Sequence, residues 1–172
     1  MRAIIFSDSH GDISHLEDAI KHYGKPEYRF GLGDYEVDDY VLDVFGVTGV
    51  RGNSWSDPSW PYTMLYENEG FRILLTHGHR FSVKGGLYYL EEYCKNNNID
   101  ICFYGHTHEA SIKRIGNITF INPGSCGMPS YPPYPTLCYM EINGGIAHIK
   151  IVDAIDYSTY KEITIDKNGK WD

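Results

Sequence analysis

AIIFSDSHGD, residues 3–12, is an apolar run that ends abruptly in carboxylate and imidazole side chains. Four consecutive apolar residues followed by polar ones are typical of a short strand buried on both faces. The residues directly after such a strand, Asp8 and His10, carry chemistry rather than packing surface. Residues 3–12 therefore predict a buried strand that delivers metal-type ligands at its carboxyl end.

Four later segments repeat this arrangement, each of them after an apolar, strand-like run. They are GLGDY at 31–35, RGNS at 51–54, THGH at 76–79 and GHTH at 105–108. Oxygen and nitrogen donors from five strand ends can enclose two metal ions, and paired ions can clamp the oxygens of a phosphoryl group. The candidate ligands are Asp8, His10, Asp34, Asn53, His77, His106 and His108.

The spacing within the clusters suits one shared cavity. Residues i and i+2 of an extended chain point to the same side, so Asp8 with His10, and His106 with His108, are predicted to face one cavity as pairs. Carboxylate, imidazole and amide donors suit Mn, Fe, Zn, Co or Ni better than Ca. Glycines that permit tight turns and close backbone approach accompany the ligands, namely Gly11, Gly33, Gly52, Gly78 and Gly105.

Composition limits the class of protein. The chain has 172 residues, 42% of them hydrophobic, which predicts one globular domain spanning 1–172. The net charge of −8 argues against a surface that tracks duplex DNA, so no stable nucleic-acid complex is expected. Phosphate substrates remain compatible with this charge, because bound divalent ions reverse the local charge.

The expected location is the cytoplasm. No apolar run approaches 18 residues, so we expect no membrane span. None of the four cysteines lies in a ligand cluster or has zinc-finger spacing, and they are interpreted as reduced, mostly buried thiols. They are Cys94, Cys102, Cys126 and Cys138.

The periodicity predicts an α/β fold. Strands at 3–6, 28–32 and 47–50 alternate with helices at 13–23 and 37–45, the second with Val37, Tyr40, Val41 and Val44 on one face. Strands then dominate: hairpins at 62–75, 109–121 and 136–152, a strand at 101–104, an edge strand at 160–165, and one helix from Leu87 to the polar run 95–98. This order indicates two sheets packed face to face with helices outside, and ligands at the carboxyl ends of strands.

In this order the five clusters resemble the signature of the calcineurin-like metallophosphoesterase superfamily. Over residues 1–151, the chain is similar to its compact YfcE-type bacterial and archaeal phosphodiesterase branch, and the Asn-Pro-Gly-Ser turn at 122–125 is typical of that branch. The tail from Asp153 carries no known motif. The resemblance implies a four-layer αββα sandwich of two mixed β-sheets flanked by helices.

The resemblance also implies roles for the ligands. Asp8, His10 and His108 would hold one metal, Asn53, His77 and His106 a second, and Asp34 would bridge both. A hydroxide between two divalent ions would be the nucleophile, with Mn the first expectation and Ni, Zn, Fe, Co or Mg as alternatives. Asp34 and Asn53 thus count as catalytic as well as ligating.

One departure from the family concerns the residues after Asn53. Many members have His there, and the small branch commonly has Cys-Asp, whereas this chain has Ser54-Trp55. Ser54 is a candidate substrate contact but a poor acid. His79 is then the remaining candidate catalytic imidazole, with orientation of His77 or of a water as the simpler alternative. Arg51 is a candidate phosphate contact, or a solvated loop residue.

Aromatic residues cluster near these motifs. Trp55, Trp60, Tyr62 and the YPPYP segment at 131–135 are candidates for stacking on a base or an aromatic ester. The alternative is a rigid surface loop or a subunit contact, since exposed aromatics favour interfaces.

These observations favour a metal-dependent phosphohydrolase that acts on small phosphate esters, and the branch that the chain resembles implies diesters. A phosphomonoesterase is the close alternative, because the ligand set suits both. A different class, a binding scaffold, is suggested by the retromer scaffold subunit, which resembles this fold with a degraded metal centre. The small phosphodiesterases often associate, so a homo-oligomer is expected by analogy.

Overall fold

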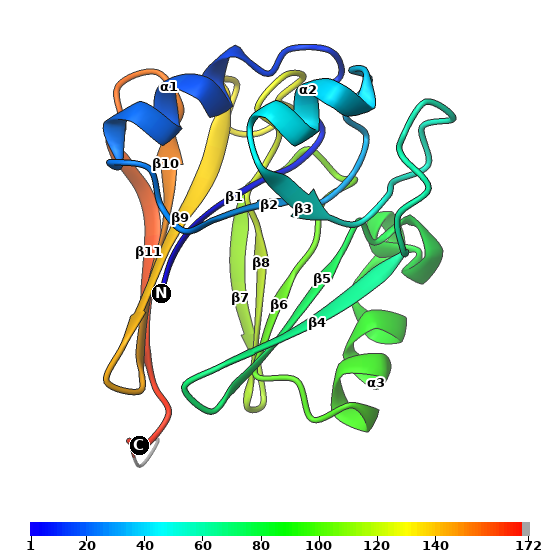
Figure 1. Cartoon of the computed structure of the whole chain (residues 1–172). Helices are drawn as coiled ribbons and strands as arrows, with labels where there is room; N and C mark the ends of the chain where they lie inside the picture. Colours follow the sequence, from blue (N-terminus) through cyan, green and yellow to red (C-terminus); the bar gives the residue numbers. More distant parts are fainter. Residues whose placement is uncertain (170–172) are drawn as a thin grey trace.

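The computed structural model describes residues 1–169 and contains two mixed β-sheets, shown in Figure 1. Residues 170–172 of the predicted domain lie outside the described part. The six-stranded sheet has the order β11 (Thr159–Asp166), β10 (Ile146–Asp153), β9 (Thr136–Asn143), β1 (Arg2–Phe6), β2 (Tyr28–Gly31), β3 (Val47–Gly49). The five-stranded sheet has the order β4 (Thr63–Asn68), β5 (Phe71–Thr76), β6 (Ile101–Phe103), β8 (Ile118–Asn122), β7 (Ser111–Ile115).

The helices complete four layers. In Figure 1, α1 (Ser14–His22) and α2 (Asp39–Val44) lie over the six-stranded sheet, and α3 (Tyr88–Asn96) lies beside the five-stranded one. Three apolar clusters fill the spaces between layers. The fold class is thus the predicted αββα sandwich.

The central strand β1 explains why its sequence is apolar without alternation. Ala3 and Ile5 belong to the cluster between the two sheets, whereas Ile4 and Phe6 belong to the cluster under α1 and α2. Successive side chains of a strand point to opposite faces, so a strand covered on both faces needs an apolar residue at every position.

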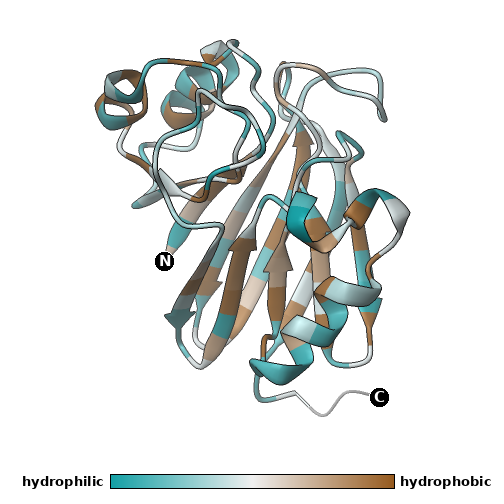
Figure 2. Cartoon of the chain, turned by 90° about the vertical axis from the view of Figure 1, so that its right-hand side faces the viewer, coloured by the Kyte–Doolittle hydropathy of each residue, from teal (hydrophilic) through white to brown (hydrophobic). Residues whose placement is uncertain are grey.

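Helix α3, unlike β1, is covered on only one face and therefore needs apolar residues on that face alone. Its buried residues, Leu90 and Cys94, are one helical turn apart and pack on the five-stranded sheet. Figure 2 shows the apolar colours on the strands, while the outer surface of this helix carries hydrophilic residues.

Topology gathers the ligand clusters. β1, β2 and β3 run parallel, and so do β5, β6 and β8. The five clusters follow β1, β2, β3, β5 and β6, so the prediction that each lies at a strand's carboxyl end is confirmed.

The predicted face of the second helix is wrong. The helix spans Asp39–Val44 instead of 37–45, and Tyr40 and Val44 are 65% and 73% exposed. Its buried residue is Leu42. Because Asp38 is extended (φ −63°, ψ 142°), Val37 lies outside the helix, and a helical phase counted from Val37 does not continue through it.

Two predictions from composition can be compared with the structure. All four cysteines are free and buried, as expected. Within residues 1–169, no helix is both long and apolar enough to cross a membrane.

Candidate metal centre

The seven predicted ligands converge at the edge where the two sheets meet. Their ligand atoms form one group from Asp8, His10 and His108 and another from Asp34, His77 and His106, each within 4.8 Å. The Nε2 atoms of His10 and His108 are 3.3 Å apart, and His77 Nε2 is 3.1 Å from His106 Nδ1. Asn53 Oδ1 adjoins the second group, 3.1 Å from His77 Nε2.

Asp34 lies between the two groups. Its Oδ2 is 3.4 Å from His77 Nε2 and 4.0 Å from His10 Nε2. The same carboxylate therefore reaches the nitrogen donors of both groups. Its other oxygen, Oδ1, accepts a hydrogen bond of 2.8 Å from the backbone N–H of Ser54.

The backbone at the ligands is not extended, contrary to the argument from i, i+2 spacing. Positive φ angles between 43° and 69° occur at five of the seven ligands: Asp8, His10, Asp34, His106 and His108. The pairs converge because the chain turns at each of them. Asp and His are enriched in the left-handed region but still cost energy there, on the order of 1 kcal/mol per residue. The surrounding fold must therefore hold these loops in place.

Glycine is required where the loops pass close to the carboxylates. A Cβ added to Gly105 would lie 2.8 Å from Asp8 Oδ2, and one added to Gly52 would lie 2.7 Å from the backbone N of Asp34. Both contacts are shorter than carbon atoms tolerate. These glycines thus allow loops from different strands to approach the ligands.

Three imidazoles are oriented by bonds on the ring edge away from the site. A proton on Nδ1 leaves the lone pair of Nε2 directed into the centre, which is the usual arrangement of metal-binding histidines. The Nδ1 partners are Glu36 Oε1 at 2.8 Å for His10, the Leu32 carbonyl at 2.8 Å for His77, and the Met128 carbonyl at 2.7 Å for His108.

Charge at the centre is negative. Burial raises the pKa of Asp34, but the hydrogen bond and the charge of His77 outweigh it and hold that pKa below its ordinary value. Burial likewise opposes a lowered pKa at Asp8, where the adjacent His108 imidazole, 3.1 Å from Oδ1, prevails. Burial, with the charges of His77 and Lys84, lowers the pKa of His106 to about 4, so this imidazole is neutral at pH 7.

These residues fit a pair of divalent ions. Asp8 Oδ1 is completely buried and has no hydrogen-bond partner, although Oδ2 accepts bonds from Ser7 Oγ and the His106 N–H. A buried, unpaired carboxylate oxygen facing imidazole lone pairs is costly unless a cation lies between them. Two carboxylates with neutral nitrogen donors are a suitable ligand set for Mn, Fe, Zn, Co or Ni.

Asp57 is an important residue that sequence reasoning missed. Its buried carboxylate accepts backbone N–H bonds from Asp34 at 2.7 Å, Tyr35 at 2.9 Å and Gly52 at 2.6 Å. It thereby joins the loop after β2 to the loop after β3. The available signal was an acidic residue in the same loop as the departure at Ser54-Trp55.

The turn at 122–125 supports two further loops. Ser125 Oγ donates to the Asp8 carbonyl at 2.7 Å, and Asn122 Nδ2 donates to the Gly105 carbonyl at 3.1 Å. The sequence singled out this turn as typical of a branch, but not its contacts with the ligand loops.

The other candidate residues are placed unequally. The His79 ring lies 5.3 Å from that of His77, and its buried Nδ1 has no partner. Ser54 meets Asp34 through its backbone, while its hydroxyl contacts Ser56 Oγ at 3.1 Å. Arg51 lies beside the Tyr62 ring, 5.4 Å from its centroid.

The aromatic candidates also separate. Trp55 is 94% exposed and beside the site loop, whereas Trp60 packs against Tyr35 with ring centroids 5.6 Å apart. Trp60 therefore serves the core under α2 rather than a substrate.

Comparison with known proteins agrees with this geometry. Residues 1–145 match the calcineurin-like phosphoesterase superfamily domain. The chain belongs to this family. It is 28% identical to a probable metallophosphoesterase of Mycoplasma pneumoniae, over 84% of this chain and 91% of that one. It is 34% identical to the phosphodiesterase YfcE of Escherichia coli K12, over 66% of this chain and 63% of that protein.

Two solved structures with the same fold are a predicted phosphoesterase and a Vps29 protein. A predicted phosphoesterase from Streptococcus pneumoniae superposes with a TM-score of 0.81 at 29% identity, covering 95% of this chain and 97% of that one. Vps29 from Entamoeba histolytica, complexed with Zn²⁺, gives 0.79 at 25% identity, covering 98% of this chain and all of that one.

Proposed function

We propose that this calcineurin-like phosphoesterase is a phosphodiesterase with a binuclear metal centre. The observation that carries the proposal is the complete ligand set: two carboxylates, one amide and four imidazoles meet within hydrogen-bonding range at the end of both sheets. The phosphodiesterase name of the relative YfcE supports the choice of diesters.

Asp8, His10 and His108 would hold one ion, Asn53, His77 and His106 the other, and Asp34 would bridge them. Two divalent ions, when bound, supply a hydroxide nucleophile at neutral pH and neutralise charge on the phosphoryl oxygens. Mn²⁺ is our first candidate, because the donors are hard or borderline.

The chain's own residues would position the substrate and fix proton positions. The carbonyls of Leu32 and Met128 and the carboxylate of Glu36 keep protons on the outer nitrogens of three histidines, so that the inner lone pairs remain free. His79 has its unpaired Nδ1 next to this group, and burial followed by the charge of His77 lowers its pKa. A neutral His79 would orient a water or accept its proton.

The decisive experiment is a panel of phosphomonoesters and phosphodiesters, assayed with Mn, Ni, Zn or Mg added to metal-stripped protein. We expect metal-dependent turnover with bis(p-nitrophenyl) phosphate preferred over p-nitrophenyl phosphate. The reverse preference would assign a phosphomonoesterase.

A second candidate is a binding scaffold with a weak centre. It is favoured by the likeness to Vps29 and by the absence of an imidazole at Ser54. Absence of turnover on every ester with every metal, while two ions bind, would favour the scaffold.

A further inference from the structure

We infer that the pocket beside the metal centre is a substrate subsite for the part of the diester that carries a second anionic group on a ring-bearing alcohol, such as a phosphorylated nucleoside. This inference rests on the proposed phosphodiesterase function and narrows its substrate class. It is carried by the position of the pocket, by its two unpaired ammonium groups and by its aromatic wall.

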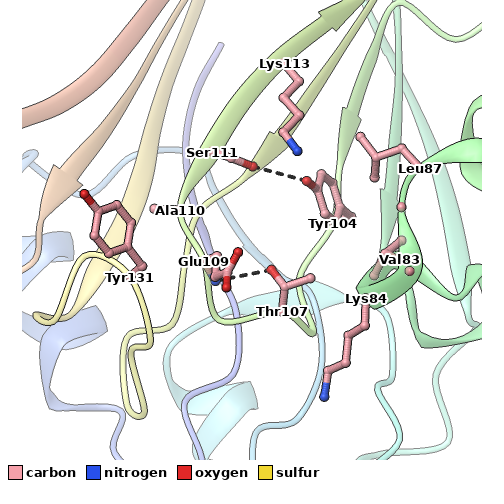
Figure 3. Close-up of a pocket in the computed structure, with 12 residues that line it drawn as sticks. Val83, Lys84, Leu87, Tyr104, Thr107, Glu109, Ala110, Ser111, Lys113 and Tyr131 are labelled. Atoms are coloured by element: carbon pink, nitrogen blue, oxygen red, sulfur yellow. Dashed lines mark hydrogen bonds between the residues drawn. The ribbon is translucent and has the colours of Figure 1, made fainter.

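The pocket opens directly beside the ligand loop. It has a volume of about 590 Å³, within the range of small-molecule sites. Thr107, which lies between two ligands in sequence, is part of its lining, and so are Glu109 and Ala110. Figure 3 shows Thr107 and Glu109 at one side of this pocket, with Lys84 nearby. A substrate phosphate at the metal centre would therefore extend its substituent into the pocket.

Two lysines give this region a local positive charge within an acidic chain. Lys84 and Lys113 line the pocket from different segments, and Figure 3 shows them on opposite sides of it. Neither ammonium group forms an ion pair with another residue in the range 1–169. Lys84 lies near enough to the centre for its charge to contribute, after burial and the charge of His77, to the lowered pKa of His106.

These positions assign different roles to the two lysines. Lys84, on the side of the centre, would contact the reacting phosphoryl group. Lys113 would contact an anionic group further along the substituent. Charge-assisted contacts of this kind are stronger than neutral hydrogen bonds, and they are stronger still where a pocket limits access of water.

One wall of the pocket is aromatic and is bonded through its backbone to the ligand loop. Tyr131 is 63% exposed, and its carbonyl accepts a hydrogen bond of 2.8 Å from the Ala110 N–H. The neighbouring Ser130 N–H donates to the His108 carbonyl at 3.1 Å. The backbone of Tyr131 is therefore held beside the ligand loop, and its exposed ring at the pocket rim is available for a planar ring of the substrate to pack on. Glu109 offers acceptors to hydroxyl or amine hydrogens of the same substituent.

The test uses two substrates that differ by one phosphate. Thymidine 5′-(p-nitrophenyl phosphate) and its 3′-phosphorylated form release the same p-nitrophenolate: water adds to phosphorus, the P–O(aryl) bond breaks, and the 5′-phosphate dianion, p-nitrophenolate and two protons are the products. We expect the Mn-loaded protein to have about tenfold higher kcat/KM for the 3′-phosphorylated substrate, the typical contribution of one charge-assisted contact. In Lys113→Glu, the two substrates should have equal kcat/KM values.

Lys25→Glu is the matched control. This exposed lysine precedes β2, at the opposite end of the six-stranded sheet from the ligands, and the substitution changes charge equally. It should leave the ratio unchanged. Tyr131→Ala should lower kcat/KM for both thymidine substrates about tenfold, and Tyr131→Phe should not.

Equal kcat/KM values for both substrates in the wild type, or an unchanged ratio in Lys113→Glu, would overturn the subsite. If no diester is hydrolysed with any metal, the proposed function fails, and calorimetric binding to the metal-free protein then decides the subsite separately. Thymidine 3′,5′-bisphosphate should bind more tightly than thymidine 5′-phosphate, and Lys113→Glu should remove the difference. Equal binding would overturn the subsite there too.

Discussion

The two sheets contribute different chemistry to one centre. Loops of the six-stranded sheet bring Asp8, Asp34 and Asn53, the oxygen donors, together with His10. Loops of the five-stranded sheet bring only imidazoles: His77, His106 and His108. Negative charge is therefore concentrated on one half of the site and neutral nitrogen on the other.

The two halves are also held in place differently. The carboxylates of Asp8 and Asp34 accept backbone N–H bonds, from His106 at 3.0 Å and Ser54 at 2.8 Å. The imidazoles of His77 and His108 instead donate to carbonyls. Loss of a carboxylate should thus remove both charge and a fixed loop contact, whereas loss of a residue beside the imidazoles should remove orientation alone.

The largest effect is expected for Asp34→Ala, which removes the carboxylate lying between both groups. We expect kcat/KM for bis(p-nitrophenyl) phosphate to fall about 10³-fold or more, since paired ions supply several kcal/mol of transition-state stabilisation. Bound metal, measured by mass spectrometry, should fall below two ions per chain. Asp43→Ala, on the exposed side of α2, is the control. Full activity of Asp34→Ala would refute the bridging role.

Asp57→Ala tests whether the oxygen-rich half depends on the three backbone hydrogen bonds that the buried Asp57 carboxylate accepts. Three backbone N–H groups lose their acceptor, and we expect the free energy of unfolding of the metal-free protein to fall by about 3 kcal/mol or more. Urea titration measures this. Asp57→Asn keeps one acceptor oxygen and should fall in between. An unchanged midpoint in Asp57→Ala would show that water replaces the carboxylate at no cost.

Ser54→His tests whether an imidazole added to the oxygen-rich half can act as a general acid for the leaving group. In the wild type, we expect aryl diesters to react far faster than alkyl diesters, because the leaving group departs without a proton. An imidazole at position 54 should raise the alkyl rate by about 10²-fold, the lower end of general acid catalysis. The exposed Trp55 leaves room for it. A flat dependence of wild-type kcat/KM on leaving-group pKa would place protonation elsewhere.

His79→Ala probes the imidazole-rich half and should have the smallest effect. His79 lies beside His77 without joining either ligand group. Activity should fall about 10–100-fold, as for residues that act through a ligand, with two ions still bound. Complete loss of activity, equal to that of Asp34→Ala, would mean that His79 itself acts on the substrate.

The sequence identified the candidate ligands that converge in the structure because each follows a strongly apolar strand, so that a local pattern marks a polar residue with no packing role. Their conformation could not be predicted: the positive φ of His10 or His108 depends on which loops face each other across the two sheets. The contacts of Asp57 with Asp34 and of Ser125 with Asp8 were missed because these partners lie 23 and 117 residues apart in the chain. The buried face of α2 was predicted wrongly because six residues form fewer than two turns, which is too short for a helical periodicity to be recognised.

The pairing of β1 with β9 determines when the six-stranded sheet can form during translation. Ile4 lies opposite Tyr139, so the first strand made receives its second neighbour only when the last quarter of the chain emerges. At typical elongation rates this delay is on the order of 10 s. Until His108 has been made, the nascent chain presents Asp8 and His10 without the third member of their ligand group. We therefore expect the ligands of the proposed centre to come together only late in synthesis, and the timing of metal uptake by nascent chains would test this expectation.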